Sequence, residues 1–249
     1  MTDLVLLEFA PPIATLTINR PEARNALSID LLTALHEAVG RLATRADCSV
    51  ALMAGSGKAF CAGMDLKAVL GDRATAFRLL ESLADLTIRM RRLPQVTIAR
   101  VNGAAIGGGC GLATVCDFAI THADAKLGFP EVDLGVCPAV VAPWLVRKVG
   151  AGTARRILLR GGVMSGTEAH QCGIVSQVVA TREELDLAAA ALAQRLAEGG
   201  PNALRATKDL LNRLDGSFDE AIVRRGAELS AEVLSTPESQ ATLRSKLGL

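Results

Sequence analysis

Two short segments near the start of the chain alternate apolar and polar residues. They are residues 4–10 and 13–18, and they flank the pair Pro11-Pro12. In the second segment isoleucine and leucine alternate with Thr15 and Thr17. Because successive side chains of a strand point to opposite faces, this alternation predicts two strands joined by a turn at the prolines.

Apolar residues at helical spacing follow, and they predict a helix over 29–43 with Ser28 as its N-cap. Beyond Pro138 the pattern is mostly helical, with Thr153 and Thr167 as further candidate caps. By the same reasoning, strands are predicted at 49–55, 96–101, 117–124, 125–131 and 173–179, and helices at 75–91, 182–198, 202–213 and 217–235.

Strands that alternate with helices are typical of an α/β fold. No strand is predicted after about residue 180, and Gly199-Gly200-Pro201 is the clearest break in the pattern. We therefore expect an α/β core over 1–198 and a C-terminal helical region over 199–249. A helical tail of this kind is expected to pack at a subunit interface.

Composition and charge narrow the class of protein. The chain has 249 residues, of which 50% are hydrophobic, and a formal net charge of +1. Its Lys and Arg residues are dispersed, whereas nucleic-acid-binding proteins concentrate them on one face, so we expect no nucleic-acid partner. The N-terminus lacks the basic flank of a signal peptide, and the apolar stretches are too short or too rich in Gly and Pro for a membrane span. We expect a soluble cytoplasmic protein.

The sequence contains no motif that indicates a metal or nucleotide cofactor. The six cysteines form no CxxC pair, and the three histidines are isolated, so we expect reduced thiols and no metal site. The stretch GSGKAF lacks the Walker spacing, because Leu52 and Ala59 stand where a glycine and a Ser or Thr are required. The run from Gly107 to Leu112 likewise ends without the last glycine of a dinucleotide fingerprint.

Two glycine-containing loops after predicted strands are the first candidate for chemistry. They are AFCAGMDL (59–66) and NGAAIGGGCG (102–111). If the second loop opens a helix, its first N–H groups are unpaired and lie at the positive end of the helix dipole. Two such N–H groups aimed at one oxygen would form an oxyanion hole. Close packing of two strand-to-helix turns explains the glycines equally well.

The second candidate is an acid with apolar neighbours. Glu131 lies between Phe129-Pro130 and Val132. Burial raises the pKa of a carboxyl group and suits it to proton transfer near neutral pH. Taken alone, a surface glutamate in a turn after proline is the simpler explanation, and Asp133 could be the acid instead.

Four motifs in the same order as in a known family link these features. They are NRPEARNALS (19–28), GSGKAFCAGMDL (55–66), VNGAAIGGGCGLATVCD (101–117) and KLGFPEVDLGVCP (126–138). Together they resemble the crotonase superfamily, the enoyl-CoA hydratase/isomerase family, over about residues 1–180. The resemblance implies a crotonase-like spiral of ββα units with a helical C-terminal region, usually assembled as a homotrimer or a dimer of trimers.

The resemblance also implies residue roles. The backbone N–H groups of Met64 and Gly108 would hold the thioester oxygen of an acyl-CoA, and Glu131 would be the catalytic acid/base. Coenzyme A would enter as part of the substrate, with no tightly bound cofactor. Residues expected to contact the substrate or its CoA part are Arg24, Ala26, Ala62, Asp65, Leu66, Lys67, Gly109 and Pro138.

Gly111 departs from the pattern, because typical hydratases of the family carry a second glutamate at this position. An oxyanion hole and one acid suffice for a double-bond shift, so we expect an enoyl-CoA isomerase that uses Glu131. Two alternatives stay open: a hydratase or dehydratase of an unusual substrate, in which a substrate group replaces the missing carboxylate, and a non-catalytic acyl-CoA-binding protein.

Overall fold

Short apolar strands build two sheets in the computed structural model, which describes residues 3–249. The larger sheet has the order β1(Val5–Ala10), β2(Ile13–Ile18), β3(Val50–Gly55), β5(Val96–Val101), β7(Phe118–His122) and β10(Gln177–Val179). The smaller sheet has the order β4(Ala59–Cys61), β6(Ala104–Ile106), β8(Lys126–Gly128) and β9(Val163–Ser165). The α/β fold expected from the sequence is confirmed.

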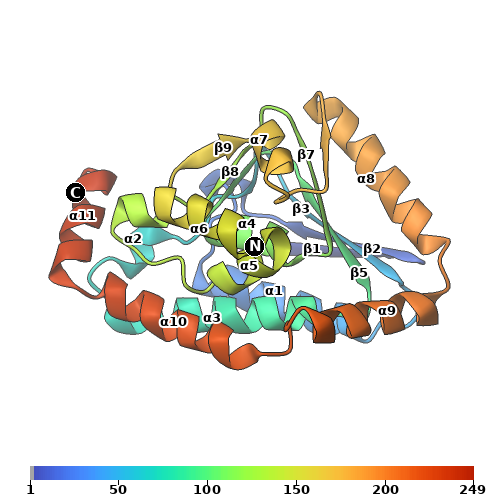
Figure 1. The fold of residues 1–249 in the computed structure, drawn as a ribbon, viewed down its shortest axis with the longest axis horizontal. Coiled ribbons are helices and arrows are strands. Elements are labelled where there is room, and N and C mark those ends of the chain that lie inside the picture. The colour runs from blue at the N-terminus through green and yellow to red at the C-terminus, as the bar shows by residue number, and fades with distance from the viewer. Residues whose placement is uncertain (1–2) are drawn as a thin grey trace.

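From β3 to β8, consecutive strands lie alternately in the two sheets. β3, β5 and β7 lie in the larger sheet, and each is followed at once by a strand of the smaller sheet. Within each sheet these strands pair in parallel, whereas β1 with β2 and β8 with β9 pair antiparallel. The chain therefore winds as a spiral, which brings the loops after successive strands to one region (Figure 1).

Helices enclose the larger sheet. α8 packs on one face, where Leu185 and Ala189 contact a cluster that includes Val50, Ile98 and Ile120 (Figure 1). The main core lies on the other side of the sheet. The helices and the two short 3-10 helices are η1(Pro21–Ala23), α1(Ile29–Ala43), α2(Leu66–Val69), α3(Arg73–Arg91), α4(Gly108–Val115), η2(Pro130–Leu134), α5(Ala142–Val149), α6(Ala151–Arg160), α7(Gly166–Gln171), α8(Arg182–Ala197), α9(Pro201–Leu214), α10(Glu220–Leu234) and α11(Pro237–Leu247).

Most predicted elements are present, with some corrections at their ends. Ser28 caps α1 by accepting from the Leu31 N–H. The prediction of Thr153 and Thr167 as N-caps is wrong: Gly150 precedes α6, and Ser165 caps α7 in a reciprocal pair with Glu168. The Ser165 hydroxyl caps this helix in preference to that of Thr167, because Glu168 can then bond back to the backbone N–H of Ser165.

Strands β4, β6 and β9 of the smaller sheet and the last helix were not predicted, whereas β8 lies within the predicted strand 125–131. Strands β4, β6 and β9 span three residues each, which is too short for alternation to be recognised. The predicted strand over 173–179 is observed only at 177–179. Pro237 occupies the first turn of α11, where proline fits because the N–H it lacks would have no partner there.

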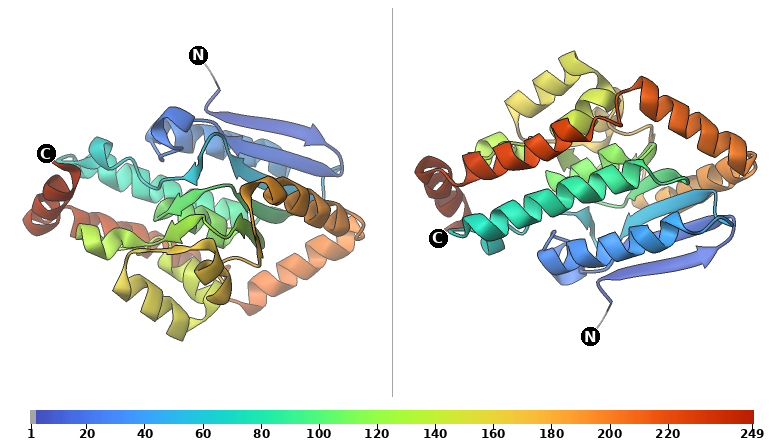
Figure 2. Two further views of the ribbon diagram at one scale, coloured as in Figure 1. Left: turned by 90° about the horizontal axis from the view of Figure 1, so that it is seen from above. Right: turned by 90° about the horizontal axis from the view of Figure 1, so that it is seen from below.

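The C-terminal helices lie against the rest of the chain. α10 runs beside α3 in every view (Figures 1 and 2). α9 is held by polar anchors, because the buried Lys208 bonds to Asp117 and to the Gln95 carbonyl, both at 2.7 Å. Arg91 also bonds to Asp117, at 3.3 Å. Of the helices in residues 3–249, none has the length and apolar character needed to cross a membrane.

Candidate active site

Asn25 fixes the loop that precedes α1. It is fully buried and has a left-handed backbone (φ 58°), which asparagine tolerates better than most residues. Its side-chain amide donates to the carbonyls of Ser56, Ala59 and Phe60 at 2.9–3.1 Å, and its oxygen accepts from the Arg20 N–H at 2.8 Å. The first motif is thereby attached to the loop that carries Met64.

The backbone pairing at Leu27 sets the direction of the Met64 N–H. Leu27 donates to the Gly63 carbonyl at 2.7 Å, and Asp65 donates to the Leu27 carbonyl at 2.9 Å. In this parallel bridge the two residues that flank Met64 make both bonds to Leu27. Because peptide groups alternate in direction along an extended chain, the N–H of Met64 points away from Leu27.

The start of α4 lies against that same loop. A Cβ at Gly109 would lie 2.1 Å from the Cys61 carbonyl oxygen, and a Cβ at Gly63 would lie 2.6 Å from the Ile106 oxygen and 3.7 Å from the Gly108 nitrogen. Only glycine permits these backbone approaches. They bring the Met64 segment beside Gly108.

Gly108 is the first residue of α4, after Gly107 as N-cap. The first intrahelical bond runs from the Gly111 N–H to the Gly107 carbonyl at 2.9 Å. The N–H groups of Gly108 and Gly109 precede that bond, so neither has an acceptor within the helix, and both lie at the positive end of its dipole.

Glu131 is the second residue of η2, and its carboxylate lies over Gly107. A Cβ at Gly107 would lie 2.8 Å from Glu131 Oε1. The Oε2 atom is buried and has no hydrogen-bond partner within the described part of the chain. Burial raises the pKa of Glu131 to about 7, so the carboxyl group can both accept and donate a proton near neutral pH.

Two thiols lie near Glu131. Burial raises the pKa of Cys110 in α4 to about 12. Burial and, to a smaller extent, the negative charge of Glu131 also raise the pKa of Cys137. Both thiols are therefore neutral near pH 7, and neither contributes a charge that would fix the protonation of Glu131.

Most of the residues expected to contact the CoA part lie around the two loops. The Ala62 N–H donates to the Arg24 carbonyl at 3.0 Å, so these two expected contacts are adjacent. Arg24 and Lys67 are exposed, whereas Gly109 is buried in α4. The last expected residues, Ala26 and Leu66, are partly buried.

Asp65 and Pro138 are placed differently from the other predicted residues. Asp65 is bound to the Arg20 guanidinium at 3.2 Å, so its carboxylate already has a partner. Pro138 lies beyond η2, in the turn before α5, and its carbonyl accepts from the Ala142 N–H. Among residues 3–249, no hydrogen bond joins Pro138 to the two loops.

Gly111 is enclosed by a side chain from α5. A Cβ at Gly111 would lie 2.3 Å from Val141 Cγ1 and 3.1 Å from Val141 Cβ. Val141 is the N-cap of α5 and is itself buried. The space that a side chain at position 111 would need is therefore occupied by a valine.

Three positioning side chains were missed by the sequence analysis. Asn102 accepts from the Gly55 N–H at 3.0 Å and donates to the Gly57 carbonyl at 3.2 Å, so it shapes the Met64 loop together with Asn25. Asn102 directly follows an apolar segment and precedes Gly103, which was a usable signal for a turn, but nothing in the sequence indicated what either buried amide contacts. Val141 carried no signal, because its contact with Gly111 exists only in the folded chain.

Trp144 is part of the core. It is 2% exposed, and its indole N–H donates to Thr87 Oγ1 in α3 at 3.0 Å. Among residues 3–249, no group of three His, Cys, Asp or Glu side chains is arranged to hold a metal ion.

Comparisons with known proteins show which family the chain resembles. Residues 8–245 match the family model described as enoyl-CoA hydratase/isomerase. The chain is 36% identical to the crotonyl-CoA hydratase of Syntrophomonas wolfei, covering 84% of this chain and 81% of the relative. It is 35% identical to the 2,3-dehydroadipyl-CoA hydratase of Escherichia coli, covering 81% and 78%.

Solved structures show the same fold. A crystal structure of an enoyl-CoA hydratase from Mycobacterium avium superposes with a TM-score of 0.88 at 28% identity, covering 100% of this chain and 97% of that one. An enoyl-CoA hydratase from Bacillus halodurans has a TM-score of 0.89 at 23% identity, covering 97% and 99%, and its likeness concerns the fold alone.

The contact between Gly111 and Val141 predicts an unusual effect of substitution. Gly→Ala inside a helix normally stabilises a protein by about 0.5–1 kcal/mol. Gly111→Ala is expected to destabilise by about 1–3 kcal/mol, because the new methyl group overlaps Val141. Chemical denaturation of Gly111→Ala, Val141→Ala and the double variant measures their coupling, expected at about 0.5–3 kcal/mol.

Gly152→Ala is the matched control, since Gly152 is an exposed helical glycine with no heavy atom within 4 Å of an added Cβ. It should be neutral or stabilising. Stabilisation by Gly111→Ala of the same size would contradict the close contact with Val141.

Proposed function

Because this chain belongs to the enoyl-CoA hydratase/isomerase family, we propose that it shifts the carbon–carbon double bond of an enoyl-CoA with Glu131 as its single acid/base. The observation that carries the proposal is the contact between Gly111 and Val141. Position 111, which holds a second glutamate in typical hydratases, is bare here, and a valine fills the adjacent space. One carboxyl group with a pKa of about 7 remains.

The proposed reaction needs one base and one anion-binding site. Glu131 removes a proton from the carbon beside the thioester of a 3-enoyl-CoA. The negative charge that develops on the thioester oxygen is stabilised by the N–H groups of Met64 and Gly108. The protonated Glu131 then returns the proton to the far end of the dienolate, which yields a 2-enoyl-CoA and restores the carboxylate. No net electron transfer and no further reactant are required.

The part of the substrate that the site would recognise is the CoA thioester, on which this family acts. We propose that Ala26 and Ala62 contact the CoA part mainly through the backbone, beside Leu66 and Gly109. The exposed Arg24 and Lys67 are available for its phosphates. Asp65 has a different role in this proposal, because its bond to Arg20 orders the loop. All six cysteines are free, which supports a reducing compartment such as the cytoplasm.

Hydration is the second candidate function, and the relatives favour it. The two curated relatives named above are hydratases at 35–36% identity. A single acid can position water and later protonate the substrate, and a polar group of the substrate could replace the missing carboxylate. A non-catalytic acyl-CoA-binding protein is the third candidate, which the glycine at 111 favours and the raised pKa of Glu131 does not.

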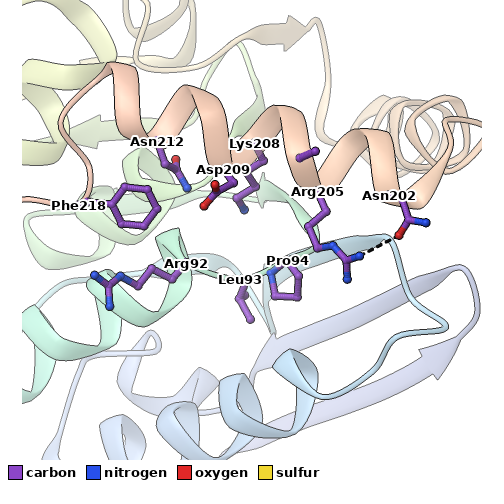
Figure 3. A pocket seen from close by; sticks show the side chains of 10 residues that line it. Arg92, Leu93, Pro94, Asn202, Arg205, Lys208, Asp209, Asn212 and Phe218 are labelled. Carbon is purple, nitrogen blue, oxygen red and sulfur yellow. Dashed lines mark hydrogen bonds between the residues drawn. The ribbon is translucent and has the colours of Figure 1, made fainter.

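We also propose that the C-terminal helical region, 199–249, forms a subunit interface of a homotrimer or a dimer of trimers. α9 is anchored to the core through the buried Lys208 and Asn212, while Leu211 and Leu214 of α9 are 54% and 74% exposed. A cavity of about 730 Å³ lies between α9 and the end of α3, bounded by Phe218 and Pro94 (Figure 3). A neighbouring subunit would cover these leucines and fill this cavity.

Substitution of Glu131 tests the proposed reaction. Glu131→Gln keeps the size of the side chain but cannot accept the proton, so turnover of a 3-enoyl-CoA should fall about 10²–10⁴-fold. The dissociation constant for the ester should stay close to that of the parent protein, as measured by calorimetry. The exposed Glu183 provides the control, Glu183→Gln, with parental activity.

Parallel assays with a 2-enoyl-CoA separate the candidates. Faster water addition than double-bond shift in the parent protein would replace isomerisation by hydration. Tight ester binding with no conversion of either ester, in the parent or in Glu131→Gln, would identify a binding protein.

The pH dependence follows from the raised pKa of Glu131. The base must be ionised, so kcat/KM for the 3-enoyl-CoA should rise with pH up to about 7 and then level off. An ordinary glutamate, with a pKa near ~4.3, would leave the profile flat from pH 5.5 upward. A flat profile over pH 5.5–9 would therefore contradict a buried Glu131 as the base.

Charges on α9 test the proposed interface. Leu211→Glu combined with Leu214→Glu should convert a trimer or hexamer into monomers in sedimentation-velocity experiments, because each buried leucine would become a buried charge. Leu187→Glu on α8, at a leucine that is 76% exposed, is the control. A parental assembly state in the double variant would place the interface elsewhere.

A further inference from the structure

The turn that carries Glu131 closes on Gly135. The Glu131 carbonyl accepts from the Val136 N–H at 2.8 Å, and the Val132 carbonyl accepts from the Gly135 N–H at 3.2 Å. Gly135 ends η2 with a left-handed backbone (φ 69°). The position of the Glu131 side chain therefore depends on where Gly135 is held.

A hydroxyl from α11 holds Gly135. Ser239 Oγ donates to the Gly135 carbonyl at 2.6 Å, and Ser239 is 4% exposed. A Cβ at Gly135 would lie 3.4 Å from Ser239 Cα and 3.3 Å from Thr242 Cβ, so the helix lies directly on this glycine. The bond joins residues 104 positions apart in the sequence.

This hydroxyl is not needed to cap its own helix. Thr236 is the N-cap of α11, and its Oγ1 accepts from the Ser239 N–H at 3.2 Å. Thr236 Oγ1 lies 2.9 Å from both the Val233 carbonyl and Ser239 Oγ, and its single proton can be donated to either. Removal of the Ser239 hydroxyl therefore leaves the cap in place.

The next residue of α11 binds the opposite part of the site. Gln240 Oε1 accepts from the Gly71 N–H at 2.9 Å, and Gln240 Nε2 donates to the Leu234 carbonyl at 2.8 Å. Gly71 follows α2, which begins directly after Met64 and Asp65. Two adjacent residues of α11 thus connect the turn that carries Glu131 with the segment that follows Met64.

A second anchor restrains the turn from another direction. Asp133 accepts from the Gly162 N–H at 2.7 Å, between α6 and β9. The turn that follows Glu131 is therefore held at two points, at Asp133 by Gly162 and at Gly135 by Ser239.

We propose that Ser239 is a positioning residue for Glu131, which acts through Gly135 to hold the carboxylate over Gly107, and that α11 joins the two parts of the site through Ser239 and Gln240. The inference rests on the proposed role of Glu131 as the acid/base. It predicts that chemistry at Glu131 depends on a hydroxyl that touches neither substrate nor reacting atoms.

The charged groups around this turn are not altered by a substitution at Ser239. Apart from the thiols of Cys110 and Cys137, the ionisable neighbours are Asp133 and the charged residues of the two helices packed on η2. Those of α6 and α11 are all exposed: Arg155, Arg156, Arg160, Glu238, Arg244 and Lys246. Ser239→Ala removes none of these charges, so a change in the pKa of Glu131 would report its position and solvation.

The experiment compares Ser239→Ala with Ser239→Thr, which keeps the hydroxyl, and with Ser245→Ala at an exposed serine of the same helix. Ser239→Ala should lower kcat for a 3-enoyl-CoA by up to about 100-fold with little change in KM, because a small displacement of a reacting group costs rate. Ser239→Thr should recover much of kcat, and Ser245→Ala should match the parent. Parental kcat in Ser239→Ala would overturn the proposal.

Infrared titration of the unliganded protein provides a readout that needs no activity. The carboxyl band that is lost in Glu131→Gln reports Glu131, and its pKa should fall in Ser239→Ala as water reaches the loosened turn. If no variant isomerises any ester, the proposed function fails, but this shift would still support the positioning role. An unchanged pKa in Ser239→Ala would overturn it.

Discussion

The close approach of two backbones is the constraint on which the rest of the site depends. The loop around Gly63 and the start of α4 touch with no side chain between them, at distances that only glycine permits. This contact brings the Met64 and Gly108 segments together. Asn25 and Asn102 stabilise this contact, because their side-chain amides donate hydrogen bonds to carbonyls of the loop that leads to Met64. A buried irregular loop needs such partners, because unpaired polar groups are costly inside a protein.

The burial of Glu131 is useful for proton transfer but does not favour folding. Its pKa is raised from 4.5 to about 7 in the folded chain, so stability is lost as the pH rises from the range in which the solvated carboxyl group of the unfolded chain ionises up to about 7. Stabilisation must then come from elsewhere. The bonds from Ser239 to Gly135 and from Gly162 to Asp133 lie beside the acid, where they can hold the turn without neutralising the carboxylate.

The contact between Gly111 and Val141 adds a packing role to the glycine. The sequence shows only that a carboxylate typical of the family's hydratases is absent at position 111, whereas the structure shows that Val141, at the start of α5, packs on α4 at this glycine. The missing acid has been replaced by apolar packing and not by an empty space. Gain of a second acid at position 111 would therefore require changes at both positions.

The sequence by itself determined the strongly periodic elements, the family and the identity of the candidate acid. Helix 29–43 was predictable because six apolar residues and a capping serine agree on it, and Glu131 because its local motif is specific. The three-residue strands, the Asn25 and Asn102 anchors, Val141 against Gly111 and Ser239 against Gly135 were decided only by the tertiary structure. Each of them is a contact between residues far apart in the chain, and a single sequence contains local periodicity but not the distances that folding creates.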